Sequence, residues 1–136
     1  MTELEALQAA IAGEHAALYG VGVAGGKLSG ARFSAATTLY ERHRSRRDQL
    51  AEMLIESDQT PAAAEPAYDL PGPVTNAATA AALVLGIERR LAAVYGDLVE
   101  AAEQDRTRVF AIQALIASSR EQLSWGGKPA AFPGQV

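Results

Sequence analysis

Residues 57–74 read SDQTPAAAEPAYDLPGPV and contain four of the six prolines in the chain. Proline lacks a backbone N–H and breaks the interior of a helix, so this segment is expected to connect helices and not to continue one. Its 18 residues could span about 60 Å when extended, whereas a helix of ~26 residues is about 39 Å long. The segment can therefore cross the whole length of a helical bundle, which predicts one long crossover.

Two helical segments precede this connection. The first begins at a capping-box pattern of Thr2 and Glu5, and it is expected to end near Leu28, before the break at Ser29 and Gly30. The second is expected to run over residues 31–56. Its predicted inward stripe is Phe33, Ala36, Tyr40, His43, Arg47, Leu50 and Leu54.

Two further helical segments follow the connection. Thr75 is the expected cap of the third, and the fourth is expected to begin near Gln104 or Asp105. Glycine and proline make residues 126–136 an irregular tail. The third helix is predicted to turn inward Ala78, Ala81, Leu85, Glu88, Ala92, Tyr95 and Val99, and the fourth Val109, Ile112, Ile116 and Leu123.

The pattern as a whole predicts an all-α fold. The chain has 29 alanines, which favour closely packed helices, and no strand-length run alternates. Short links make each flanking helix pair an antiparallel hairpin. We therefore expect residues 1–136 to form a single four-helix domain with ferritin-like topology, in which residues 57–74 are the crossover between the second and third helices.

Composition excludes several classes of site. The chain has no cysteine, so disulfides and thiolate metal sites are ruled out. Neither a secretory signal nor a run of about 18 apolar residues is visible, and we expect a cytoplasmic protein without membrane contact. The net charge of −4 disfavours nucleic-acid binding.

Two carboxylates fall on the inward stripes, Glu14 on the first helix and Glu88 on the third. Buried carboxylates are costly without a cation, and Arg47 follows His43 by one helical turn. The sequence therefore predicts a core charge cluster of Glu14, Glu88, Arg47, His43 and Tyr40, with Arg46, Arg120 and Tyr95 as possible additional partners. A glutamate at a helix edge would instead be solvated.

Four short stretches carry a resemblance to a known family. They are EHAALYG at residues 14–20, HRSRRD at 43–48, YDLPGPV at 68–74, and the ending with Trp125 and AFPG at 131–134. The chain resembles a family of small bacterial ferritin-like domains of unknown function. The resemblance implies the fold and a ferritin-like ancestry, but no activity.

A di-iron site in such a bundle takes single glutamates from two helices and a Glu-x-x-His from each of the other two. Glu14 and Glu88 match the single glutamates. The two histidines, His15 and His43, are preceded three residues earlier by Ala12 and Tyr40, so the second half of the site is missing. We therefore expect a degenerate site without metal or other cofactor. The alternative is one metal held by Glu14, Glu88 and His43.

Three functions remain open at this point. The first is a non-catalytic structural or interaction module, which we favour; the second is a metal- or small-ligand-binding protein that uses the core. The third is a binder of acidic partners through the basic residues 42–47. A homodimer is expected, and its contact could be the small-residue stripe of the first helix or Trp125 and Phe132, which could instead fold back on the bundle. The stripe, which could instead meet the second helix, is Ala9, Gly13, Ala16, Gly20 and Ala24.

Overall fold

The computed structural model describes residues 1–134 and is all-helical over that range, without strands. Its four helices confirm the predicted all-α four-helix bundle. They are α1 (Glu3–Gly25), α2 (Gly30–Glu56), α3 (Ala77–Ala101) and α4 (Asp105–Ser124). Within the described range, none of these helices combines the length and the apolar character that crossing a membrane requires.

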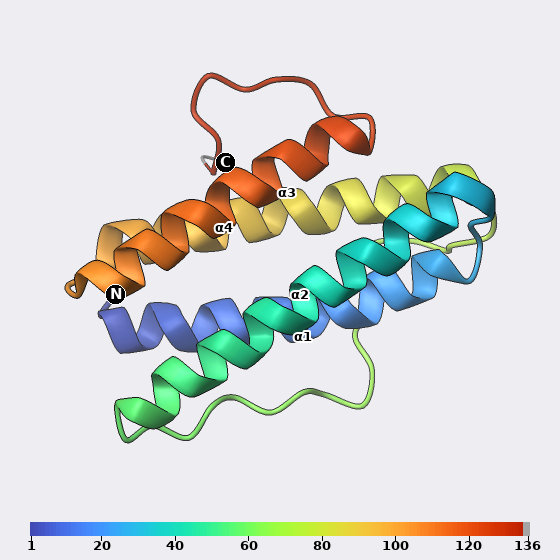
Figure 1. The fold of residues 1–136 in the computed structure, drawn as a ribbon. Helices are drawn as coiled ribbons and strands as arrows, with labels where there is room; N and C mark the ends of the chain where they lie inside the picture. Colours follow the sequence, from blue (N-terminus) through green and yellow to red (C-terminus); the bar gives the residue numbers. More distant parts are fainter. Residues whose placement is uncertain (135–136) are drawn as a thin grey trace.

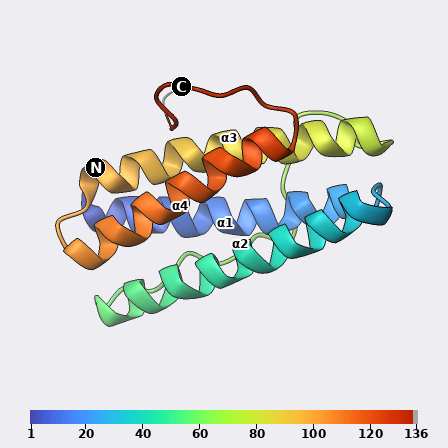
Figure 2. The same cartoon turned by 45° about the horizontal axis from the view of Figure 1, so that its top comes forward.

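The helices form two antiparallel hairpins joined by the long linker. Figures 1 and 2 show α1 and α2 as one hairpin and α3 and α4 as the other, with the linker running from the end of α2 to the opposite end of the bundle. The backbones of α1 and α3 pack closely, as do those within each hairpin; α2 and α4 approach less closely. The linker is thus the predicted crossover.

Local capping explains where the helices begin. The Thr2 hydroxyl accepts the Glu5 N–H at 3.1 Å, and the Glu5 carboxylate accepts the Thr2 N–H at 2.8 Å, as the capping box predicts. The cap of α3 is Asn76 and not Thr75, because the Asn76 side chain accepts the Thr79 N–H at 2.9 Å. At its other end α1 stops at Gly25, three residues before the predicted Leu28.

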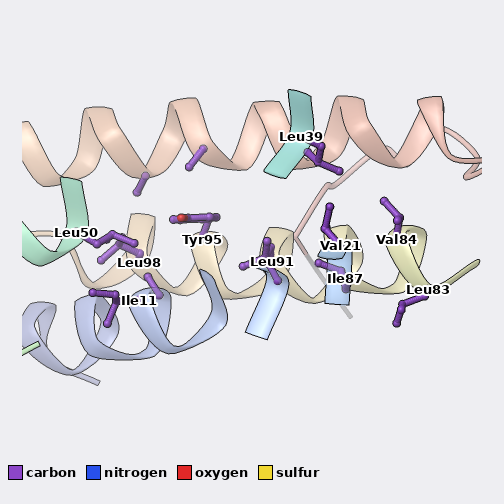
Figure 3. Close-up of a cluster of buried hydrophobic side chains, with 14 of the residues drawn as sticks. Ile11, Val21, Leu39, Leu50, Leu83, Val84, Ile87, Leu91, Tyr95 and Leu98 are labelled. Carbon is purple, nitrogen blue, oxygen red and sulfur yellow. The ribbon is translucent and has the colours of Figure 1, made fainter. Parts of the chain in front are cut away.

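Small residues bring α1 and α3 together. A Cβ on Gly13 would lie 3.1 Å from Leu91 Cδ2, and one on Gly20 would lie 2.5 Å from Ile87 Cδ1. Gly13 and Gly20 of the small-residue stripe therefore pack against α3 of the same chain, a neighbour that the sequence did not predict for them. This contact continues into the apolar core, where Ile87, Leu91, Tyr95 and Leu98 follow one another along α3 (Figure 3).

The prediction for α4 was wrong about which face is buried. Val109, Ile112, Ile116 and Leu123 are exposed, and the residues buried are Thr107, Ala111, Ala114 and Ser118. Alanine and serine let the α4 backbone lie close to α3, which leaves the larger side chains on the opposite surface. A prediction from side-chain size and spacing alone therefore selected the outer face of α4 and not the buried one.

The buried face of α2 is rotated by part of a turn from the predicted one. Leu39 and Met53 are buried, whereas Phe33 and Tyr40 are exposed. Tyr40 lies instead beside α1, where it and Phe33 line a shallow groove with Gly22. Ala36, His43, Leu50 and Leu54 are buried as expected.

Polar side chains of α1 hold the linker. The Gln8 amide donates to the Thr60 carbonyl and accepts the Ala62 N–H, both at 2.8 Å. His15 Nε2 lies 2.9 Å from the Ala62 carbonyl oxygen. The proline-rich crossover is therefore bound along the bundle and not merely tethered at its ends.

Candidate functional site in the bundle core

Four polar side chains meet at the middle of the bundle. Glu14 comes from α1, His43 from α2, and Glu88 and Tyr95 come from α3. Each of these residues is 0% exposed. We call these four residues the core cluster.

His43 bridges the two carboxylates. Its Nδ1 lies 2.7 Å from Glu14 Oε2, and its Nε2 lies 2.6 Å from Glu88 Oε1. A neutral imidazole can donate through only one ring nitrogen, whereas the imidazolium donates through both. The geometry is therefore that of a charged histidine between two carboxylates, with each hydrogen bond assisted by charge.

The acidity of His43 follows from two opposing effects. Burial favours the neutral ring and by itself lowers the pKa. The hydrogen bonds to Glu14 and Glu88 outweigh burial and raise the pKa of His43 from 6.5 to about 9. The ring is accordingly protonated at neutral pH.

Tyr95 donates a second hydrogen bond to the Glu14 carboxylate. Its hydroxyl donates to Glu14 Oε1 at 2.5 Å, so both oxygens of Glu14 have a donor. Burial and the neighbouring Glu14 charge raise the pKa of Tyr95 well above 10, and the phenol stays protonated. Arg46, partly buried on α2, places a guanidinium nitrogen 3.5 Å from His43 Nδ1.

Three predicted members lie outside the core cluster. Arg47 bonds Asp48 through two nitrogens at 3.0 and 2.8 Å, because its long side chain can reach a carboxylate at the surface without being desolvated. Tyr40 lies on the groove beside α1. Arg120 lines a cavity under the C-terminal tail and is exposed. Of the residues that the sequence named, the structure brings together Glu14, His43, Glu88 and Tyr95, and it places Arg46, named as an additional partner, beside them in the position expected of Arg47.

On α4, Ser118 is a buried polar residue that the sequence did not single out. Ser118 Oγ and Glu88 Oε2 are buried, and neither has a hydrogen-bond partner among the described residues. Gln122, one turn beyond Ser118, places its amide nitrogen 3.5 Å from the Glu88 carbonyl oxygen. The only sequence signal for Ser118 was a serine among the alanines of the inner face, which the larger outer-face residues obscured.

The core cluster lacks the geometry of a metal centre. Over residues 1–134, no group of three or more His, Asp or Glu side chains is arranged to hold a metal ion. Both ring nitrogens of His43 already face carboxylate oxygens, so neither offers a lone pair to a cation.

Comparison with known proteins supports the fold but gives no activity. A family model described as a domain of unknown function (DUF4439) matches residues 6–136. The chain is also similar to a conserved hypothetical protein, rv2844, from Mycobacterium tuberculosis. That crystal structure is 34% identical, has a TM-score of 0.88, and aligns over 90% of this chain and 93% of its own. No protein with a curated description matches the sequence.

Proposed function

The chain belongs to the DUF4439 family, a domain of unknown function, and we propose that it is a non-catalytic, metal-free bundle of ferritin-like ancestry that serves as a structural or interaction module. The observation that carries this proposal is the position of His43, which bonds Glu14 with one ring nitrogen and Glu88 with the other. In a ferritin-like bundle, paired glutamates of this kind would bind a metal.

The residues present do not fit a di-iron site. The α4 positions that face the core are occupied by Ala111, Ala114 and Ser118, none of which supplies a carboxylate or an imidazole. On α2 the residue three before His43 is Tyr40, which lies on the groove beside α1. The His43 imidazolium brings to the glutamates a positive charge of the kind that a metal would have supplied.

A metal-loading experiment tests this proposal. The protein is purified without chelators, offered ferrous iron and manganese aerobically, and measured for metal per chain by elemental analysis. We expect the same low metal content in the wild type and in Glu14→Gln and Glu88→Gln. Near-stoichiometric metal in the wild type that disappears in both variants would overturn the proposal and favour a metal-binding core.

The interaction part of the proposal concerns the outer face of α4, which we define as Val109, Ile112 and Ile116. These side chains are 53%, 40% and 46% exposed and lie opposite the buried alanines. Their spacing of three and four residues forms one apolar stripe, which is typical of a helix that packs against another helix.

The charges at the ends of this stripe favour a second copy of the chain as the partner. Asp105 lies at one end of the stripe and Arg120 at the other, and both are exposed. When two α4 helices pack antiparallel about a two-fold axis near Ile112, Asp105 of each copy comes near Arg120 of the other. Such a contact is self-complementary, as an isologous dimer requires.

Sedimentation equilibrium tests the dimer. The wild type is expected to form a dimer, and the double variant Ile112→Glu with Ile116→Glu is expected to be monomeric. The matched control is Ile55→Glu, because Ile55 is similarly exposed at the end of α2, outside the stripe. A monomeric wild type, or a dimer that survives the double substitution, would contradict this part of the proposal.

A further inference from the structure

The C-terminal residues 126–134, which we call the strap, fold back over α3 and α4 (Figures 1 and 2). The root of the strap is fixed by Trp125, which is buried and stacks under the Arg32 guanidinium at 4.7 Å. Its indole N–H donates to Glu121 at 3.2 Å. The strap therefore starts from an anchored position.

Glycine is required at both ends of the strap. Gly126 has φ +93° and Gly134 has φ +87°, which L side chains rarely adopt. A Cβ on Gly134 would also lie 2.8 Å from the Ala92 carbonyl oxygen of α3. At the root, the Gly127 N–H donates to the Gln122 carbonyl oxygen at 2.7 Å. The path of the strap is thus specified by the sequence.

A cavity of about 600 Å³ lies between the strap, α3 and α4. This volume is in the range of small-molecule pockets. Its charged lining residues are Arg89 from α3, Arg120 from α4 and Lys128 from the strap, and its lining includes no carboxylate side chain. Across residues 1–134, none of these three cations makes an ion pair.

The rest of the cavity wall is largely apolar. Leu123 and Phe132 line it and are 49% and 71% exposed, so each has apolar surface that an occupant could cover. Ser119 and Gln122 add polar groups that could orient an occupant. Other lining residues are Ala92, Pro129, Ala130 and Pro133.

We propose that this cavity binds a small organic anion that combines a carboxylate or phosphate head with an apolar chain. Arg89, Arg120 and Lys128 line the cavity from separate elements and form no ion pair within residues 1–134, in a protein of net charge −4, so positive charge is concentrated there. Of the three, Arg120 also lies at the proposed α4 contact, so the proposal rests mainly on Arg89 and Lys128. Guanidinium groups bind both head groups through directed, charge-assisted hydrogen bonds. The apolar chain would cover Leu123 and Phe132. This inference is independent of the metal-free core.

Backbone amide NMR titration with sodium octanoate tests the cavity. Octanoate is expected to give saturable shifts centred on residues 119–134, whereas acetate lacks the chain and octanol lacks the charge, so each binds more weakly. The double variant Arg89→Gln with Lys128→Gln should bind octanoate at least roughly tenfold more weakly, since it loses two charge-assisted contacts. Both residues lie outside the proposed α4 dimer contact.

The matched control removes one arginine and one lysine elsewhere. Arg44→Gln with Lys27→Gln makes the same change in net charge at exposed positions outside the cavity lining, and octanoate should bind it as it binds the wild type. Octyl phosphate in the same series distinguishes the two head groups, and saturable binding of either supports the proposal. The proposal fails if neither binds saturably, if the cavity variant binds like the wild type, or if the control is weakened equally.

Discussion

The two hairpins are joined differently on the two sides of the bundle. Between α1 and α3 the contact is close and buried, with Gly20 against Ile87 and the core cluster at its centre. Between α2 and α4 the backbones stay further apart, and long side chains span the distance. Arg106 bonds Glu56 at 2.6 Å at one end, and Arg42 bonds Glu121 at 2.9 Å towards the other.

The difference shows where polar interactions carry stability. In the core cluster, losing Glu14, His43 or Glu88 strands a charge that water cannot reach. Across α2 and α4, the two arginines are each 56% exposed, so water solvates the guanidinium groups and each ion pair contributes little. Similar ion-pair chemistry is therefore expected to have unequal effects on the two sides.

Removing His43 should have the largest effect. His43→Ala leaves Glu14 and Glu88 facing each other without the imidazolium, and breaking a buried pair typically costs ~3–5 kcal/mol. The free energy of unfolding, measured by urea denaturation at pH 6.5, should fall by that amount. His15→Ala is the control, because His15 is partly exposed and makes one hydrogen bond to the linker.

The same measurement on Glu14→Ala and Glu88→Ala tests the other members of the core cluster. Each should also be strongly destabilised, because His43 then loses one of its two carboxylates. Replacing Glu14 and Glu88 with Met, His43 with Leu and Tyr95 with Phe is expected to be close to neutral, because neither a buried charge nor an unpaired buried hydroxyl remains. Unchanged stability in both single alanine variants would show that the core cluster is not an interdependent charged unit.

Raising the pH should reproduce part of this loss in the wild type. The pKa of His43 is about 9 in the folded protein, against an ordinary 6.5. A raised histidine pKa contributes stability that is fully present below pH 6.5 and is lost as the pH rises through 9. A difference of this size corresponds to about 3 kcal/mol. Urea denaturation from pH 6.5 to 9.5 measures it, and NMR titration of the His43 ring identifies the group.

The pH dependence has its own control. In a His43→Gln variant the decline between pH 6.5 and 9.5 should disappear, because the titrating ring is absent. A decline that persists undiminished in this variant would assign it to another group.

The smallest effects are expected across α2 and α4. Arg42→Ala and Arg106→Ala each remove one exposed ion pair, and such pairs contribute about 1 kcal/mol or less. Urea denaturation at low and high salt should show little change in either variant. A loss comparable to that of His43→Ala would erase the contrast between the two sides of the bundle.

Sequence periodicity predicted most of the fold because long helices repeat their pattern many times. It also singled out Glu14, His43 and Glu88, which lie together in the structure, since a polar residue that interrupts an apolar stripe is conspicuous. It failed on α4, where alanines form the inner face and larger apolar residues lie outside. Side-chain size is therefore a poor guide to burial when two helices approach closely.

The choice between Arg46 and Arg47 could not be made from spacing. Both lie about one turn from His43, and an arginine side chain can turn towards the core or towards solvent. The nearby Asp48 carboxylate at the surface pairs with Arg47, and Arg46 is left beside His43. The bridging of Glu14 and Glu88 by the His43 ring also could not be predicted, because it depends on the relative positions of three helices.

The linker also separates the four core-cluster residues into two pairs along the chain. Glu14 and His43 precede it, whereas Glu88 and Tyr95 follow it. A protease that cut only the linker would release two helical hairpins, each with an incomplete set of charges. In a fragment-complementation assay, burial of the apolar core would drive the two hairpins to reassociate. Only the arrangement in which His43 again bonds both Glu14 and Glu88 would leave no buried charge unpaired. Because the charges are divided in this way, each hairpin is expected to associate selectively with the other.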